Sequence, residues 1–163
     1  MNIQERYWST MVKAYFSCTY LELYYEQSVK RSRCLNIFLA IVSCGSIAGW
    51  AIWNHLSFMW AIIIAISQVF NAIKPYIPYS KRIDDLYKYE RELCEVFNKL
   101  ESEWYGVANG KYTEEEVNTL LIDSKQKSKE ISNKYLYGDY LPRNEKYREL
   151  ADKKTEEYFE NNF

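Results

Sequence analysis

The sequence predicts an all-α protein: an integral membrane two-helix hairpin with an N-terminal amphipathic helix and a C-terminal cytosolic helical bundle. Three observations support this fold class. Residues 34–73 contain no formally charged side chain, apolar residues recur at helical spacing on both sides of that run, and no segment alternates as a strand does. The predicted segments are 1–33 for the N-terminal helix, 34–73 for the hairpin and 74–163 for the C-terminal helical domain.

The first segment, from about Gln4 to Arg33, is predicted to form one helix. Neither Gly nor Pro interrupts it, and Trp8, Met11 and Tyr15 fall at helical spacing. We expect this helix to continue without a break into the uncharged run.

The uncharged run has the length of two membrane spans. A helix rises about 1.5 Å per residue and the hydrocarbon core is about 30 Å thick, so about 20 residues cross it. Asn54 and His55 interrupt the run near its middle and are expected in the turn. A hairpin buried in a soluble core is the alternative, disfavoured because a chain of this size rarely needs two adjacent all-apolar helices.

The orientation of the hairpin follows from its basic flanks. Positively charged flanks stay inside the cell, so we expect both termini in the cytosol. The flanking residues are Lys30, Arg31 and Arg33 before the hairpin, and Lys74, Lys81 and Arg82 after it.

Three further helices are predicted after the hairpin. Pro75 and Pro78 each remove a backbone donor and break the second span. Thr113 followed by Glu116 is a capping box that marks the start of a later helix. The predicted helices cover residues 80–105, 113–135 and 144–160, approximately.

The helix that follows the prolines carries a heptad-like apolar seam. Such a seam packs against other helices, and we expect it to form contacts between subunits. A closed homo-oligomeric ring is expected, with four subunits favoured. The predicted oligomer contacts are Leu86, Leu93, Phe97 and Leu100.

Small and polar residues in the hairpin suggest how it packs. Gly45 and Gly49 form a GxxxG pattern, which allows close approach of helices either within one hairpin or between subunits. Polar side chains are costly in hydrocarbon unless paired or wetted, so they form either an interhelical hydrogen-bond cluster or the lining of a pore. The pore-lining candidates are Asn36, Ser57, Ile64, Gln68 and Asn71.

The four cysteines are Cys18, Cys34, Cys44 and Cys94, and they lack paired metal-ligand spacing. We interpret them as small apolar residues rather than disulfides, and we expect no metal site.

No catalytic constellation is evident. The chain has one histidine and no glycine-rich phosphate loop, so we expect no enzyme and no catalytic residue. The net charge of −1 and the lack of a basic arm disfavour binding to duplex nucleic acid. The lysine run is either a solvated helix face or a contact for an anionic ligand or lipid headgroups. The candidate anion contacts are Lys125, Lys127, Lys129 and Arg143.

The order of these features resembles a known family. Trp8 lies in the leading helix, Pro75 and Pro78 follow the hairpin, and Leu141-Pro142-Arg143-Asn144 precedes the last helix. Over essentially the whole chain this is similar to the SLATT family, the SMODS and SLOG-associating two-transmembrane effectors of bacterial antiphage defence.

The resemblance implies a function. It implies a homo-oligomeric pore-forming or ion-channel effector of the bacterial inner membrane, gated through its cytosolic helices in a nucleotide-signalled antiphage system. It also implies a regulatory nucleotide second messenger or oligonucleotide, sensed by this chain or by a neighbouring nucleotidyltransferase partner. The alternatives are a non-conducting membrane anchor or adaptor that recruits a soluble partner and, less favoured, a small enzyme or lipid-modifying protein.

Overall fold

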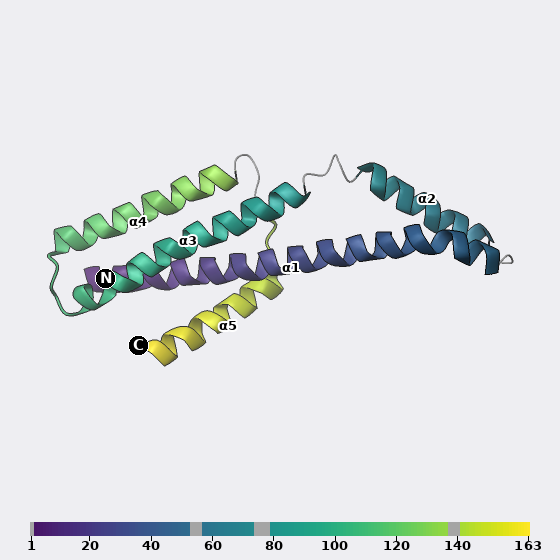
Figure 1. The fold of residues 1–163 in the computed structure, drawn as a ribbon. Helices are drawn as coiled ribbons and strands as arrows, with labels where there is room; N and C mark the ends of the chain where they lie inside the picture. The colour runs from purple at the N-terminus through teal and green to yellow at the C-terminus, as the bar shows by residue number, and fades with distance from the viewer. Residues whose placement is uncertain (1, 53–56, 74–78, 137–140) are drawn as a thin grey trace. The chain divides into compact units, whose positions relative to one another are not determined.

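A computed structural model of the chain describes residues 2–52, 57–73, 79–136 and 141–163, and its regular structure there is helical. The helices are α1 (Ile3–Ile52), α2 (Ser57–Ile73), α3 (Tyr79–Ala108), α4 (Glu114–Tyr135) and α5 (Glu145–Asn162), as Figure 1 shows. They divide into two compact units. The first unit comprises Met1–Tyr25 with Asp84–Phe163, and the second comprises Glu26–Ile83. The all-α prediction is confirmed.

Helix α1 continues without a break from the amphipathic segment into the uncharged run. No proline lies between Ile3 and Ile52, so every backbone N–H after the first turn can reach the carbonyl four residues earlier. The predicted continuity of the first helix is confirmed. Helix α1 contributes residues to both units.

The start of α4 has the predicted capping box. The Thr113 hydroxyl accepts a hydrogen bond from the Glu116 N–H at 3.3 Å, and the Glu116 carboxylate accepts one from the Thr113 N–H at 2.8 Å. Two N–H groups that have no partner within the helix are thereby satisfied. Three glutamates in the first turn also suit the positive end of the helix dipole.

Glycine is required at two places near the α3–α4 connection. Gly110 has a φ of 67°, in the left-handed region that side chains other than glycine rarely adopt. Gly106 lies inside α3, where a Cβ atom would come within 2.5 Å of the Tyr112 ring. The chain can therefore turn sharply and pack its connection closely against α3.

The first unit has its own apolar core. The N-terminal part of α1 packs against α3, with α4 and α5 on opposite sides of this pair (Figure 1). Tyr7 is fully buried, and its hydroxyl donates to the Leu100 carbonyl at 3.0 Å. The buried core residues are Tyr7, Met11, Val96, Phe97, Leu100, Val107, Val117, Leu121 and Ile131.

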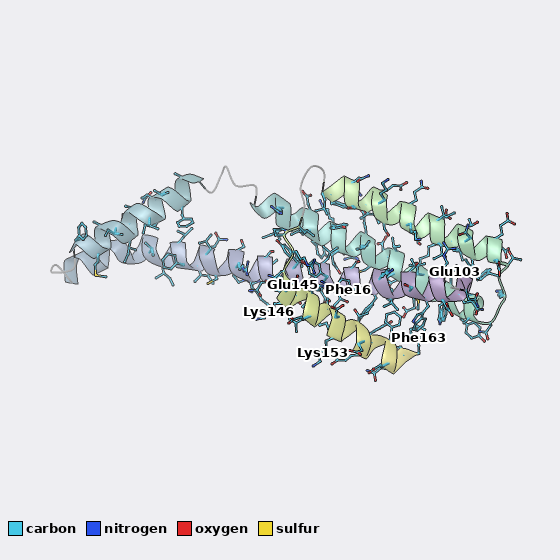
Figure 2. All side chains as sticks on the ribbon, turned by 180° about the vertical axis from the view of Figure 1, so that it is seen from behind. Phe16, Glu103, Glu145, Lys146, Lys153 and Phe163 are labelled. Atoms are coloured by element: carbon cyan, nitrogen blue, oxygen red, sulfur yellow. A yellow bond between two sulfur atoms is a disulfide. The ribbon has the colours of Figure 1, made fainter. Side chains whose placement is uncertain are left out.

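An aromatic cluster joins α5 to α1 and α3. The Tyr15 ring stacks on Tyr158 with centroids 4.2 Å apart, and Trp8 meets Phe159 edge-on at 5.1 Å. The Tyr158 hydroxyl donates to the Glu101 carboxylate of α3. Charged residues occupy most of the exposed positions along α5, and Figure 2 labels Lys153 among them. Aromatic pairs of this kind add about 0.5–1.5 kcal/mol each beyond the area they bury.

The predicted subunit contacts on α3 belong to this unit instead. Leu86, Leu93, Phe97 and Leu100 are only 4, 6, 5 and 3 % exposed within the single chain. The apolar seam was recognised correctly as a packing surface, but it packs against helices of the same chain. Side chains buried in this way are not available to a second copy, so this assignment is corrected.

The interpretation of the cysteines was also wrong for one pair. Cys18 of α1 and Cys94 of α3 form a disulfide, with Cα atoms 5.3 Å apart and a sequence separation of 76 positions. Cys34 is a free, exposed cysteine. The antiparallel packing of α1 on α3 brings the paired residues to the same level, a relation that spacing along the chain does not reveal.

The second unit leaves much of its apolar surface exposed. Leu39, Val42 and Ser67 are buried, and the Ser67 hydroxyl donates to the Ile64 carbonyl at 2.8 Å. The large exposed apolar side chains on α1 and α2 are Leu35, Ile37, Phe38, Ile41, Phe58, Met59, Ile62, Ile66, Val69 and Phe70.

Among the described residues, no helix combines the length and the apolar content that a membrane crossing requires. The predicted integral membrane hairpin, the inner-membrane localisation with cytosolic termini, and the channel and pore-forming assignments are therefore wrong. The uncharged run is divided between the end of α1 and the separate helix α2. Helix α2 has 17 residues. It therefore rises only about 26 Å, less than the hydrocarbon thickness of about 30 Å.

Two further sequence predictions lie outside the described residues. These are the turn at Asn54 and His55 and the proline break between Lys74 and Pro78.

Candidate anion-binding groove

The most distinctive site of the first unit is a groove between α1 and α4, with a volume of about 540 Å³. Its apolar floor includes Leu21, Leu93 and Leu100, which are buried. The polar lining residues are Arg6, Ser9, Thr10, Lys13, Ser17, Tyr20, Tyr89, Ser124, Lys125 and Ser128.

One face of α1 supplies most of this lining. Arg6, Thr10, Lys13, Ser17 and Tyr20 follow one another at steps of four, three, four and three residues. A helix with 3.6 residues per turn places such positions on one face. The local sequence of α1 therefore sets this row of cations and hydroxyls beside the facing residues of α4.

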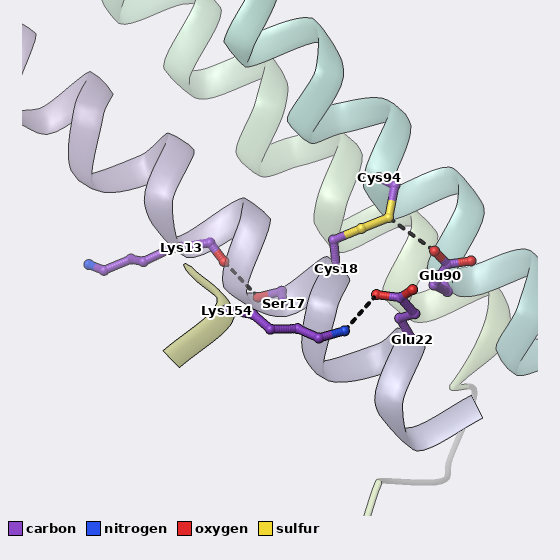
Figure 3. The surroundings of a disulfide bond; sticks show 7 residues. All are labelled: Lys13, Ser17, Cys18, Glu22, Glu90, Cys94 and Lys154. Atoms are coloured by element: carbon purple, nitrogen blue, oxygen red, sulfur yellow. Dashed lines mark hydrogen bonds and ion pairs between the residues drawn. A yellow bond between two sulfur atoms is a disulfide. The ribbon is translucent and has the colours of Figure 1, made fainter. Parts of the chain in front are cut away.

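The hydroxyl groups along the groove are oriented by their own helices. Thr10 and Ser17 donate to the Arg6 and Lys13 carbonyls, each at 2.9 Å, and Figure 3 shows the bond from Ser17. On α4, Ser124 and Ser128 donate to the Leu121 and Ser124 carbonyls at 2.9 and 2.8 Å. Because each proton is engaged by the backbone, the oxygen lone pairs remain able to accept hydrogen bonds from a ligand.

Positive charge dominates the groove. Arg6, Lys13 and Lys125 line it, and no Asp or Glu is among its lining residues. In the part of the chain that the structure describes, none of these three side chains takes part in an ion pair. Without a neighbouring carboxylate, their charges remain available to an anion.

A second cleft, between α3 and α4, differs from the groove in that carboxylates line it as well as lysines. Its volume is about 700 Å³, and its lining includes Glu92, Glu95, Glu103 and Asp123 as well as lysines. Lys134 donates to the Glu92 carboxylate at 2.6 Å. This hydrogen bond lowers the pKa of Glu92 and raises that of Lys134 to about 12. The α3–α4 cleft therefore combines carboxylates with lysines, and one of these lysines is engaged with Glu92.

The α1–α4 groove can bind an anion that also carries a ring. Its cations supply charge-assisted donors for a phosphate, and its hydroxyl oxygens can accept from amino or hydroxyl groups. The rings of Phe16, Tyr20 and Tyr89 line the same groove and provide stacking surfaces. This combination of groups matches the chemistry of a nucleotide.

The structure separates the predicted anion contacts. Lys125 lines the α1–α4 groove, whereas Lys127 lines the α3–α4 cleft with its carboxylates. Lys129 is exposed and lines neither. Arg143 pairs with Glu145 at 2.5 Å, so its charge is already engaged.

The segment before α5 also reaches the groove. Leu141 lines it, and the backbone N–H of Asn144 donates to the Tyr20 hydroxyl at 3.1 Å. Part of the Leu141–Asn144 segment that carries the family resemblance is thus next to the candidate site.

Three of the predicted pore-lining residues have side chains that the structure describes. Asn36 is exposed on α1, and Gln68 is exposed and Ile64 partly exposed on α2. Ser57 and Asn71 belong to α2 and Gly45 and Gly49 to α1, but their side-chain surroundings lie outside the described residues. The pore interpretation has already been corrected. The two explanations of the GxxxG pattern both stay predictions.

Sequence reasoning missed Arg6, Lys13 and the hydroxyl row beside them. Their spacing was a usable signal, since Arg6 and Lys13 are seven residues apart with Thr10 between them. The partner face on α4 could not be assigned in this way, because it is more than 100 residues away in sequence and meets α1 only in the folded chain.

No family model, no curated protein and no solved structure matches this chain. The resemblance to the SLATT family therefore stays a prediction.

Proposed function

We propose that this protein is a non-catalytic effector that binds a nucleotide in the α1–α4 groove and acts as a homo-oligomer. The observation that carries the proposal is the groove itself, in which Arg6, Lys13 and Lys125 are not matched by any lining carboxylate. A role in nucleotide-signalled antiphage defence rests on the family resemblance alone.

The character of the ligand follows from the lining. Cations at both walls favour a phosphate group, and the aromatic and apolar residues favour a base. A free phosphate would use only the cations, whereas a nucleotide would also use the hydroxyl oxygens and the rings. Adenosine monophosphate, a cyclic dinucleotide, a short oligoadenylate and inorganic phosphate are therefore suitable probes.

Titration calorimetry of the full chain with these four probes tests the groove. A hydrogen bond to a charged group contributes about 1.5–3 kcal/mol, so Lys125→Gln should weaken nucleotide binding about 10- to 100-fold. Lys127→Gln is the matched control, because it removes the same charge from the same helix but lines the other cleft. Equal effects of the two substitutions, or no binding of any probe by the wild type, would overturn the assignment.

Self-association is the second part of the proposal, and a different observation supports it. The second unit exposes large apolar side chains, including Phe58 at 77 % and Ile41 at 65 %. A gathering of large exposed apolar side chains in one unit is typical of an interaction site. A second copy of the chain is the proposed occupant, because residues 34–73 are uncharged and two such surfaces can meet without desolvating a charge.

Sedimentation velocity tests this part of the proposal. Burying an Ile or Phe side chain contributes about 1.5–3 kcal/mol, so Ile41→Ser and Phe58→Ser should each weaken association by about tenfold or more. Tyr105→Ser is the control, since Tyr105 is 79 % exposed in the first unit. A wild-type monomer would contradict the proposal, as would a monomer that floats with phosphatidylglycerol vesicles.

A further inference from the structure

The disulfide between α1 and α3 has carboxylates beside it. The Sγ atoms of Cys18 and Cys94 and a carboxylate oxygen of Glu90 all lie within 4.8 Å of one another. Cys94 Sγ is 3.2 Å from Glu90 Oε1. All three residues are partly buried. Once the disulfide is reduced, its two sulfurs as thiolates and the carboxylate oxygen would be a donor set for a divalent cation such as Zn²⁺.

The positions of these donors follow from helix geometry. Cys18 and Glu22 are four residues apart on α1, and Glu90 and Cys94 are four residues apart on α3. Each pair therefore lies on one face of its helix, one turn apart. The disulfide places the cysteines at one level, and Figure 3 shows Glu22 and Glu90 on the same side of it.

The negative charge of Glu90 is available to a bound cation. In the region that the structure describes, Glu90 takes part in no ion pair. The neighbouring Arg91 instead donates to the Tyr87 hydroxyl at 2.9 Å. Lys154 of α5 lies 3.9 Å from Glu22, and Arg91 is a second cation that acts on Glu90 electrostatically. A partly buried carboxylate next to sulfur is more stable with a bound divalent ion.

We propose that the reduced protein binds Zn²⁺ through Cys18, Glu90 and Cys94, with Glu22 as the fourth ligand, and that oxidation to the disulfide abolishes this site. Two thiolates and two carboxylates complete the tetrahedral coordination that Zn²⁺ favours. Helices α1 and α3 are then linked in both states, covalently in one and through the metal in the other.

The conversion balances with a dithiol reductant. The dithiol supplies two electrons and two protons and becomes a disulfide, while the S–S bond breaks to give a thiol on Cys18 and another on Cys94. Binding of Zn²⁺ then releases the two thiol protons to water. Oxidation reverses both steps, because sulfur engaged in a disulfide no longer offers thiolate charge to the metal.

The test uses the full chain with Cys34→Ser and Cys44→Ser, so that only the proposed pair of cysteines remains. The protein is reduced with dithiothreitol, freed of it without air, and titrated with Zn²⁺ against a chromophoric chelator. The reduced protein should bind one equivalent and the oxidised protein none. Co²⁺ in place of Zn²⁺ should give the intense visible absorption of tetrahedral cobalt with thiolate charge-transfer bands.

Glu90→Gln tests whether the Glu90 carboxylate is a zinc ligand, because the substitution leaves both cysteines and the disulfide in place. Changing an outer-shell partner already costs about 10- to 100-fold in metal affinity, so removing a direct ligand should raise the Kd by at least about tenfold. Glu95→Gln, an exposed position beside Cys94, is the matched control and should leave the Kd unchanged. Circular dichroism verifies that both variants keep their helices.

Two results would overturn the proposal. One is that the reduced protein binds Zn²⁺ no more tightly than the oxidised protein. The other is that Glu90→Gln binds Zn²⁺ as tightly as Glu95→Gln and the unsubstituted protein do, which would show that Glu90 is not a ligand.

Discussion

The two units of this protein treat their apolar side chains in opposite ways. In the first unit, Tyr7 and Leu121 are 0 and 1 % exposed, and helices from both ends of the chain enclose the core. In the second unit, Ile41 and Phe58 are 65 and 77 % exposed. Burial of such side chains is the main favourable term in folding, so the first unit contains its own source of stability. The exposed side chains of the second unit would gain comparable stabilisation from an occupant of that surface.

The two units also present different surfaces, although both are rich in apolar residues. Both units are helical and rich in large apolar residues, but the first unit places charged and polar side chains on its outer faces. Its α1–α4 groove offers specific chemistry to a small ligand, whereas the uncharged residues 34–73 of the second unit expose large apolar side chains. We therefore assign ligand binding to the first unit and assembly to the second as parts of one proposal.

The largest expected effect on stability comes from truncating a buried side chain of the first unit, compared with truncating an exposed one of the second unit. Leu121→Ala should lower the free energy of unfolding by about 2–5 kcal/mol, because it leaves a cavity in the core. Ile41→Ala should change it by less than about 0.5 kcal/mol in the monomer. Hydrogen exchange measured on α4 peptides at low protein concentration distinguishes the two. Similar losses from both substitutions would show that the second unit contributes to the stability of the first.

The capping box gives a smaller and more local effect. Thr113→Ala removes the hydroxyl that accepts from the Glu116 N–H, and should cost about 1 kcal/mol. Thr119→Ala is the control, since its hydroxyl donates to a carbonyl within α4 and caps nothing. Urea denaturation of both variants measures the difference. Faster hydrogen exchange in α2 peptides after Thr113→Ala would show that the stability of the second unit depends on the first.

An effect similar in size to that of Thr113→Ala is expected at neutral pH from Tyr7→Phe. Loss of the hydrogen bond to Leu100 should cost about 0.5–1.5 kcal/mol. Burial, reinforced by the nearby Glu103 carboxylate, raises the pKa of Tyr7 above its usual 10.0. In the unfolded chain the phenol ionises near its ordinary pKa, so the stability that depends on neutral Tyr7 is complete below that value and is lost as pH rises above it.

Urea denaturation at about pH 8 and about pH 11 tests this titration. Stability should fall less steeply with pH in Tyr7→Phe than in the wild type. Part of the alkaline loss should persist in the variant, because burial and the bond to Glu101 raise the pKa of Tyr158 to about 12. Identical pH profiles for the variant and the wild type would show that Tyr7 is accessible to solvent.

Short-range patterns in the sequence predicted the helices well. The Thr113–Glu116 capping box, the long helix after the prolines and the uninterrupted first helix all depend on residues within a few turns of one another. Such interactions act between positions i and i+3 or i+4, and a sequence displays them directly. The candidate site was predicted only at Lys125, since the residues that share the groove with it come from the distant α1.

The sequence by itself determined the all-α class, the helix starts and the run of residues 34–73 without charge. Only the tertiary structure decided that the α3 seam packs inside the chain, that Cys18 pairs with Cys94, and that Arg6 and Lys13 face Lys125. The physical reason is the range of the interactions. A helix forms from hydrogen bonds four residues apart, whereas burial, disulfide pairing and groove formation depend on which distant faces meet.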